Sequence, residues 1–148
     1  MLRKAKPQKE KQSTKSKPDL VDKLDKFFSK YIRLRDVMSN GYFKCISCGE
    51  YKKLQQADNG HYINRKHMKL RFSEINCNAQ CRNCNRFDEG NIIGYRQGLI
   101  QKYGEPQVLL LESMKNETKK WEEWELKSLI EHYQKEVKRL EKEKGIKL

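Results

Sequence analysis

Cys45-Ile46-Ser47-Cys48-Gly49 and Cys81-Arg82-Asn83-Cys84 are two C-x-x-C pairs separated by 32 residues. Each pair turns two thiolates toward one point, and two pairs complete the tetrahedral four-sulfur shell that Zn²⁺ prefers. Because four thiolates close that shell, we expect a structural zinc ion and not a catalytic one. The doubled spacing disfavours the alternative, four reduced cysteines in an ordinary core. The fifth cysteine, Cys77, lies outside both pairs and is predicted to be an inert core residue.

The composition is strongly basic, with 33 lysines and arginines against 20 aspartates and glutamates in 148 residues, a net charge of +13. This charge favours a polyanionic partner, with nucleic acid ahead of an anionic membrane surface. The length suits one compact domain with appended segments, so two large domains are excluded. Since no secretory or membrane-spanning apolar run is found, we expect a soluble cytoplasmic protein with no membrane partner.

The chain divides into four predicted segments. Residues 1–17 are a basic arm with almost no hydrophobic residues, expected to be disordered and either to bind phosphates or to act as a solubilising tail. Apolar residues at helical spacing predict an N-terminal helix over 18–40. Residues 41–104 hold the cysteine pairs, and 105–148 form a C-terminal helical extension. Within these segments we predict strand-like runs at 42–43, 61–63 and 75–77 and helices over about 92–103, 108–114 and 119–144.

The last of these helices carries an apolar stripe at a spacing close to that of a coiled coil. The stripe could fold back on its own domain or pair with a second copy of the chain, so a homodimer through the C-terminal helix is one of two interpretations. Its members are Leu126, Ile130, Tyr133, Val137 and Leu140.

Polar residues with catalytic potential lie between and beside the cysteine pairs. An unperturbed imidazole has a pKa of about 6.5, which makes His61 the natural candidate for a general base that activates water. Asn85 directly follows Cys84 and supplies a neutral oxygen suited to a hard cation such as Mg²⁺. Asn76 is expected to cross-link main-chain groups of a loop.

The order His61, Asn76, Asn85, threaded through the two cysteine pairs, resembles the HNH, or His-Me finger, nucleases in their zinc-bearing form. The resemblance implies an α+β fold: a small ββα-metal core with a four-cysteine zinc site, flanked by N-terminal and C-terminal helices. A hairpin would carry the histidine, and the next helix would start at the second cysteine pair. The three residues would form the catalytic site, with Asn85 on a catalytic Mg²⁺ or Mn²⁺ ion held against the scissile phosphate.

Several short motifs follow one another in a fixed order along most of the chain: Phe28-Ser29-Lys30-Tyr31-Ile32-Arg33-Leu34-Arg35-Asp36, the first cysteine pair, Gly60-His61, Leu70-Arg71-Phe72, Gln80-Cys81, Cys84-Asn85, Gly90-Asn91 and Gly94-Tyr95-Arg96-Gln97-Gly98-Leu99-Ile100. Together they resemble the phage NinG recombination proteins, also called Rap. That resemblance implies a structure-selective endonuclease that acts on branched DNA, such as Holliday junctions and D-loops, during phage recombination in the bacterial host.

One position departs from the wider nuclease class, in which an Asp directly precedes the histidine and binds the metal. This chain has Gly60 there, as do the NinG-like proteins, so the second ligand of the catalytic metal is open. Asp58 and Asn59 are nearby substitutes, and Asp58 is the acidic one. The missing Asp favours one alternative to a nuclease, a zinc-stabilised DNA-binding module without catalysis. A second alternative is a recombination adaptor that works through its long C-terminal helix.

Basic residues outnumber acidic ones around the predicted site. Such a surplus is typical of proteins that bind the phosphate backbone of DNA without reading its bases. One member of this set, His67, could contact phosphate or metal or be an ordinary surface residue. The predicted DNA-binding residues are Arg65, Lys66, His67, Lys69, Arg71, Arg82 and Arg86.

Overall fold

The computed structural model describes residues 15–148, so most of the predicted basic arm over 1–17 lies outside the described residues. The last two residues assigned to that arm belong instead to the start of helix α1 (Lys17–Asp36). Ser16 is its N-cap, and its hydroxyl accepts from the N–H of Asp19 while the Asp19 carboxylate accepts from the N–H of Ser16. This capping box satisfies two N–H groups that a helix start leaves unpaired, so the helix begins at Lys17.

Helix α1 ends at Asp36, about one turn before the predicted end near residue 40. The next residue, Val37, is extended, with φ −74° and ψ 139°. It bridges to Phe43, and both side chains are buried in the hydrophobic cluster around the cysteines. The helix therefore stops where the chain turns to bury Val37 in that second cluster.

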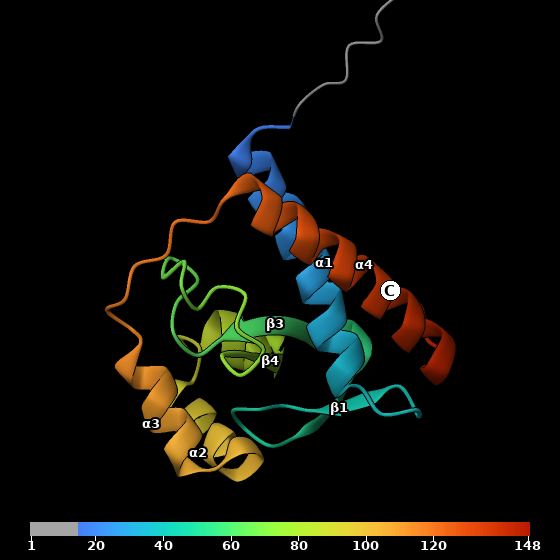
Figure 1. Cartoon of the computed structure of the whole chain (residues 1–148). Helices are drawn as coiled ribbons and strands as arrows, with labels where there is room; N and C mark the ends of the chain where they lie inside the picture. The colour runs from blue at the N-terminus through green and yellow to red at the C-terminus, as the bar shows by residue number, and fades with distance from the viewer. Residues whose placement is uncertain (1–14) are drawn as a thin grey trace, which may run out of the picture.

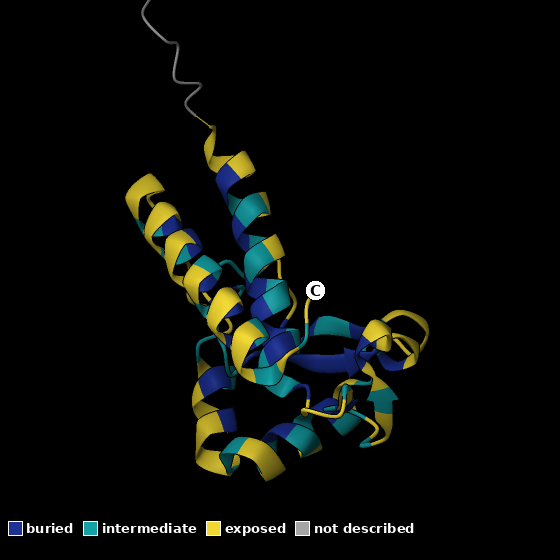
Figure 2. Cartoon of the chain, turned by 90° about the vertical axis from the view of Figure 1, so that its right-hand side faces the viewer, coloured by how far each residue is buried: buried dark blue, intermediate teal, exposed yellow. Residues whose placement is uncertain are grey.

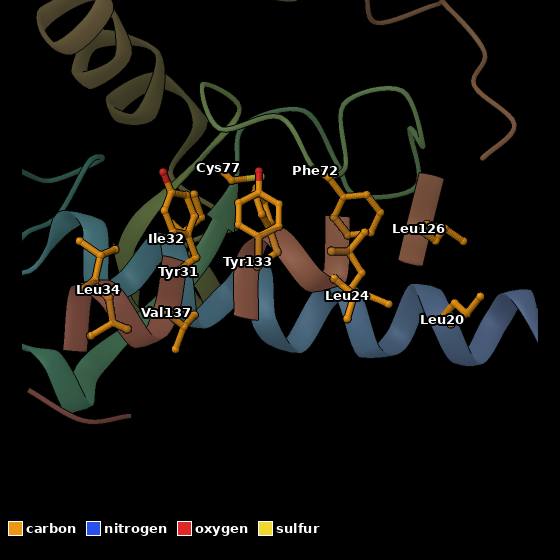
Figure 3. Close-up of a cluster of buried hydrophobic side chains, with 13 residues drawn as sticks. Leu20, Leu24, Tyr31, Ile32, Leu34, Phe72, Cys77, Leu126, Tyr133 and Val137 are labelled. Carbon is orange, nitrogen blue, oxygen red and sulfur yellow. The ribbon is translucent and has the colours of Figure 1, made fainter. Parts of the chain in front are cut away.

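Helix α4 (Glu123–Lys144) packs along α1, so the two longest helices lie side by side (Figure 1). The apolar stripe of α4 is buried in a cluster that α1 shares (Figure 3), which is the fold-back interpretation of the stripe. In this arrangement the stripe is not free to pair with a second copy. The buried members of the cluster are Leu20, Leu24, Phe28, Tyr31, Ile32, Leu34, Phe72, Cys77, Leu126, Ile130, Tyr133, Val137 and Leu140.

Two tyrosines of this cluster share one carboxylate. Tyr31 and Tyr133 donate their hydroxyl hydrogens to Glu74, with oxygen–oxygen distances of 3.0 and 3.1 Å. Burial, together with the negative charge of Glu74, raises the pKa of Tyr31 to about 12, so this hydroxyl stays a donor. The two bonds fix the loop after residue 61 to both long helices.

Helix α1 packs on a two-stranded antiparallel hairpin, β3 (Ala57–His61) and β4 (Cys77–Cys81), in which His61 pairs with Cys77. Figure 2 shows β4 buried beneath the helices. The strands differ from the predicted runs at 61–63 and 75–77: β3 ends where the first run begins, and β4 begins where the second ends. Both strands are rich in Asn, Gln and Gly, which sequence propensity disfavours in strands. The polar side chains of β4 make hydrogen bonds that repay their burial.

The remaining elements are short. The strands β1 (Tyr42–Lys44) and β2 (Tyr51–Lys53) form a second small sheet, so the strand predicted at 42–43 is confirmed. The helix expected after the second cysteine pair is one π-helical turn, η2 (Asn83–Phe87). A 3₁₀ turn, η1 (Leu54–Gln56), and helices α2 (Ile92–Tyr103) and α3 (Glu105–Ser113) complete the fold. No helix among residues 15–148 is both long and apolar enough to span a membrane.

Candidate metal centre and candidate active site

The four paired cysteines converge on one point. The sulfur atoms of Cys45, Cys48, Cys81 and Cys84 all lie within 4.8 Å of one another, so the cluster can hold a metal ion such as zinc. The fifth thiol, that of Cys77, is no member of this cluster and is fully buried. The structure therefore groups the cysteines as their spacing predicts.

The cluster joins the two small hairpins. The first cysteine pair occupies the turn between β1 and β2, where Gly49 takes a left-handed φ of +74° and its N–H donates to the carbonyl of Cys45. The second pair spans the end of β4 and the start of η2. The N–H of Ile46 donates to the carbonyl of Ala79, and the N–H of Cys81 donates to the sulfur of Cys45. Metal binding would therefore stabilise elements that are too small to hold together alone.

Helix α2 supports the first cysteine pair through two glycines. A Cβ built on Gly94 would lie 2.4 Å from the carbonyl oxygen of Ser47, and one on Gly98 would lie 1.9 Å from that of Ile46. Both neighbours are main-chain atoms, which cannot move without displacing the pair. The glycine spacing in this helix is therefore a requirement of close packing against the metal centre.

A pocket of about 250 Å³ opens beside β3, between α1 and η2. It brings together three of the predicted site residues, His61, Asn85 and Asp58, with Arg65 and Arg86 at its edge. Asn59 of β3, named with Asp58 as a nearby substitute for the missing Asp, also lines the pocket. The remaining two lining residues, Asp25 and Ser29 of α1, were not predicted from the sequence.

His61 is held in one tautomer. Its Nε2 atom lies 3.0 Å from the main-chain carbonyl oxygen of Arg71, and because a carbonyl only accepts, this nitrogen carries the hydrogen. The neutral ring then has Nδ1 unprotonated, as a general base requires. Burial lowers the pKa of His61 below its ordinary value, which favours this neutral form.

Arg71 is engaged within the protein, although the sequence predicted a DNA contact. Its Nε donates to Asp25 Oδ1 at 3.0 Å and a terminal nitrogen donates to Asp25 Oδ2, with only 15% of the arginine side chain exposed. These bonds to Asp25 raise the pKa of the Arg71 guanidinium. Little of its charge is available to a phosphate, and its position instead fixes the carbonyl that holds His61.

Asp58 is bound by two neighbours on η2. The amide nitrogen of Asn85 donates to it at 3.0 Å, and Arg86 donates to both of its oxygens at 2.7 and 2.8 Å. Because Asn85 uses its nitrogen on Asp58, its carbonyl oxygen is left as the possible metal-binding atom. Because Arg86 is paired with Asp58 inside the site, a phosphate that binds Arg86 would compete with Asp58 for its guanidinium group.

Asn59 carries the only buried side-chain nitrogen or oxygen without a hydrogen-bond partner among residues 15–148, its Oδ1 atom. An orphaned buried acceptor in a pocket indicates a missing donor or cation. With Asp58 and Asn85, it supplies hard oxygen ligands of the kind that Mg²⁺ and Mn²⁺ prefer. The position of Asn59 in the sequence supports this role, because residues two apart on a strand share a face and Asn59 therefore lies beside His61.

Asn76 lies outside the pocket and is fully buried. Its carbonyl oxygen accepts from the N–H of Ile63 at 2.8 Å, and its amide nitrogen donates to the carbonyls of Ile63 at 2.9 Å and Leu70 at 3.2 Å. These are the main-chain cross-links expected of this residue. They stabilise the loop that carries Arg71.

The other predicted DNA-binding residues are spread over the surface. Lys66 and Arg82 are exposed, whereas Lys69 lies 3.5 Å from the carboxylate of Glu117. His67 is half-buried in a turn of the same loop, and its N–H donates to the carbonyl of Asn64. Of the seven basic residues predicted, the pocket lining contains Arg65 and Arg86.

Fold and site together define a small α+β protein with a cluster of four thiols that can hold a metal ion and a histidine-bearing hairpin beside a polar pocket. The family model described as Bacteriophage Lambda NinG protein matches residues 2–143. The chain belongs to the NinG family.

Curated relatives agree with this family. Protein ninG of Escherichia phage lambda is 38% identical over 97 residues, which cover 65% of this chain and 47% of that protein. The ninG proteins of Escherichia phage 933W and Salmonella phage P22 are each 37% identical over the same length. The chain thus spans about half the length of the curated relatives it matches. No solved structure matches.

Proposed function

We propose that this chain is a metal-dependent DNA endonuclease of the HNH, or His-Me finger, type. One observation carries the proposal: a single pocket brings His61 together with the oxygen-bearing side chains of Asp58, Asn59 and Asn85. The supporting elements are the hairpin β3–β4 and the helical turn η2, in the order that a ββα unit requires. The four-cysteine cluster would hold a structural zinc ion, since its closed shell leaves no open coordination position.

Hydrolysis of a phosphodiester needs a base that takes a proton from water. His61 would be that base, because Nε2–H is fixed by the carbonyl of Arg71 and Nδ1 is left to accept. Asp25 holds Arg71, so α1 positions the base through two contacts. Asn76 acts only through the loop that it ties together.

Hydrolysis also needs a cation near the phosphate. A Mg²⁺ or Mn²⁺ ion bound in this pocket would offset the charge that develops on the phosphoryl group and the leaving oxygen. Asn59, Asn85 and Asp58 would hold it through their side-chain oxygens, and Arg86 keeps the Asp58 carboxylate in place. Asn59 would thereby supply the metal ligand that the missing Asp before His61 provides in the wider nuclease class.

Charge and family support branched DNA as the substrate. The net charge of +13 favours binding along phosphate backbones without base reading, which suits an enzyme that selects a DNA shape. The resemblance to the NinG recombination proteins favours Holliday junctions and D-loops, cut in the cytoplasm of the bacterial host.

The test is to incubate the purified protein with labelled four-way, flap and linear DNA, with and without Mg²⁺. We expect cleavage that requires the metal and that favours the branched substrates. Binding of branched DNA without cleavage in Mg²⁺ or Mn²⁺ would support a zinc-stabilised DNA-binding module instead. Mn²⁺ binding can be followed separately by electron paramagnetic resonance, and Asn59→Ala should weaken it whether or not DNA is cut.

A further inference from the structure

A second and larger hollow shares no lining residue with the candidate active site. This groove of about 770 Å³ is lined by residues of the β1–β2 hairpin, including the first cysteine pair, and of helix α2, which packs against that pair. In Figure 1 the β1 hairpin and α2 lie at the same end of the molecule, away from the start of α4. Lys44 and Tyr51 of the hairpin line one side, and Gln97, Gln101 and Lys102 of α2 line the other.

The ionised side chains that line the groove are mostly basic: they are Arg35, Lys44 and Lys102, against Asp36 as the one carboxylate. Cys45 and Cys48 of the four-cysteine cluster line it as well. The Asp36 carboxylate is already bound by Arg35 at 2.7 Å and by Lys102 at 3.0 Å. The exposed Lys44 takes part in no ion pair among residues 15–148. Because four thiolates around one Zn²⁺ would carry a net negative charge, the positive charge that this lining offers to a phosphate is that of the exposed Lys44.

The groove also exposes apolar and amide groups. Tyr51 is 59% exposed and Met38 is 39% exposed. An exposed aromatic ring beside a free lysine is the arrangement on which nucleic-acid bases stack. Gln97 and Gln101, one helical turn apart on α2, present amide donors and acceptors on the same face. Stacking on a side chain requires a base that is free of its own duplex stack, so the chemistry favours an unpaired strand over a duplex.

We propose that this groove binds a single-stranded segment of DNA, with a base stacked on Tyr51 and the backbone phosphates near Lys44. The proposal rests on the proposed function, because it takes DNA as the substrate. Flaps and D-loops offer an unpaired strand, which linear duplexes lack. A groove for that strand, separate from the pocket that would cut, gives the protein a physical basis for selecting flaps and D-loops over linear duplexes.

The test measures binding and needs no cleavage. Fluorescence anisotropy without divalent metal compares a labelled single strand with a blunt duplex of the same sequence. For Tyr51→Ala we expect about tenfold weaker binding of the single strand, because one base loses its stacking partner. The affinity for the duplex should stay within about twofold of the parent. Tyr51→Phe should bind like the parent. Tyr42→Ala is the matched control, because Tyr42 is an exposed tyrosine of the same hairpin outside the groove lining.

Each outcome decides one way. Unchanged single-strand affinity in Tyr51→Ala, or equal losses in Tyr51→Ala and Tyr42→Ala, would overturn the groove assignment, as would equal losses for single strand and duplex. If the parent cuts no DNA in Mg²⁺ but Tyr51→Ala still loses single-strand binding, the proposed nuclease fails and the groove assignment stands. Far-ultraviolet circular dichroism confirms that each variant is folded.

Discussion

His61 Nε2 and the main-chain oxygen of Arg71 lie 3.0 Å apart, and this contact connects the candidate base to the loop that α1 holds. The guanidinium of Arg71 is held in turn by Asp25 of α1. A histidine on a short two-stranded hairpin would otherwise have few fixed neighbours. Helix α1 therefore contributes to the candidate site, although the candidate base and the oxygen-bearing side chains lie on β3 and η2.

Replacing Asp25 by Asn should disturb this arrangement. The half-buried Arg71 charge loses its partner, and we expect about 1 kcal/mol lower stability, the pair being partly exposed. DNA cleavage should fall several-fold in kcat with KM for DNA and zinc content little changed. Asp22→Asn, which removes a charge that also acts on Arg71 but no hydrogen bond to it, is the control and should lower stability and kcat less than Asp25→Asn. Equal kinetics in the two variants would remove Asp25 from any positioning role.

The features of the fold that depend on local sequence patterns could be predicted from the sequence. The cysteine spacing identified the metal cluster, and helical periodicity located α2, α3 and α4 to within a few residues. The His61–Asn85 pairing in one pocket followed from a resemblance and not from periodicity. Asp25 could not be found in this way, because nothing in an amphipathic helix shows which acid meets a loop that lies 46 residues along the chain.

The hairpin strands were misplaced for a physical reason. Gln80 and Asn78 look like loop residues, yet both are fully buried. The Gln80 amide donates to Ser47 at 2.8 Å and to the carbonyl of Gly90 at 2.6 Å, and Asn78 donates to the carbonyl of Ile75 at 2.9 Å. Strand propensity does not anticipate such tertiary partners.

Removing the metal should unfold the core. The cluster joins two hairpins of two strands each, and a structural zinc site contributes its binding free energy to folding. We expect one zinc per chain by plasma emission spectroscopy and loss of near-ultraviolet circular dichroism after chelation. Cys77→Ala should keep the full zinc content, because this thiol lies outside the cluster. Folded protein that contains no zinc would contradict this assignment.

Gly98→Ala should weaken the metal centre from outside it. The added methyl would lie 1.9 Å from the carbonyl oxygen of Ile46, so the first cysteine pair must shift. We expect about 1–3 kcal/mol lower stability, as for other overpacked sites, and zinc loss at a lower chelator concentration. Gln101→Ala, on the exposed part of the same helix, is the control for stability and zinc retention. A Gly98→Ala protein as stable as the parent would show that the pair can move freely.

Deletion of residues 1–14 tests the basic arm. This segment carries five basic residues and one acidic one, and ending the deletion there keeps the Ser16–Asp19 capping box. If the arm contacts phosphates, DNA affinity should fall most at low salt and the dependence of affinity on salt should become shallower. The thermal midpoint should not change. A salt slope equal to that of the full chain would leave the arm as a solubilising tail.

The most direct test of the proposed site is cleavage of a labelled four-way junction in Mg²⁺ by the parent and by His61→Ala. Loss of the positioned base should reduce the cleavage rate by about a hundredfold or more, whereas zinc content and junction affinity should match the parent. Asn85→Ala and Asn59→Ala should instead raise the Mg²⁺ concentration needed for half-maximal rate as well as lower the rate. Cleavage by His61→Ala at the parental rate would contradict the assignment of this pocket as a nuclease active site.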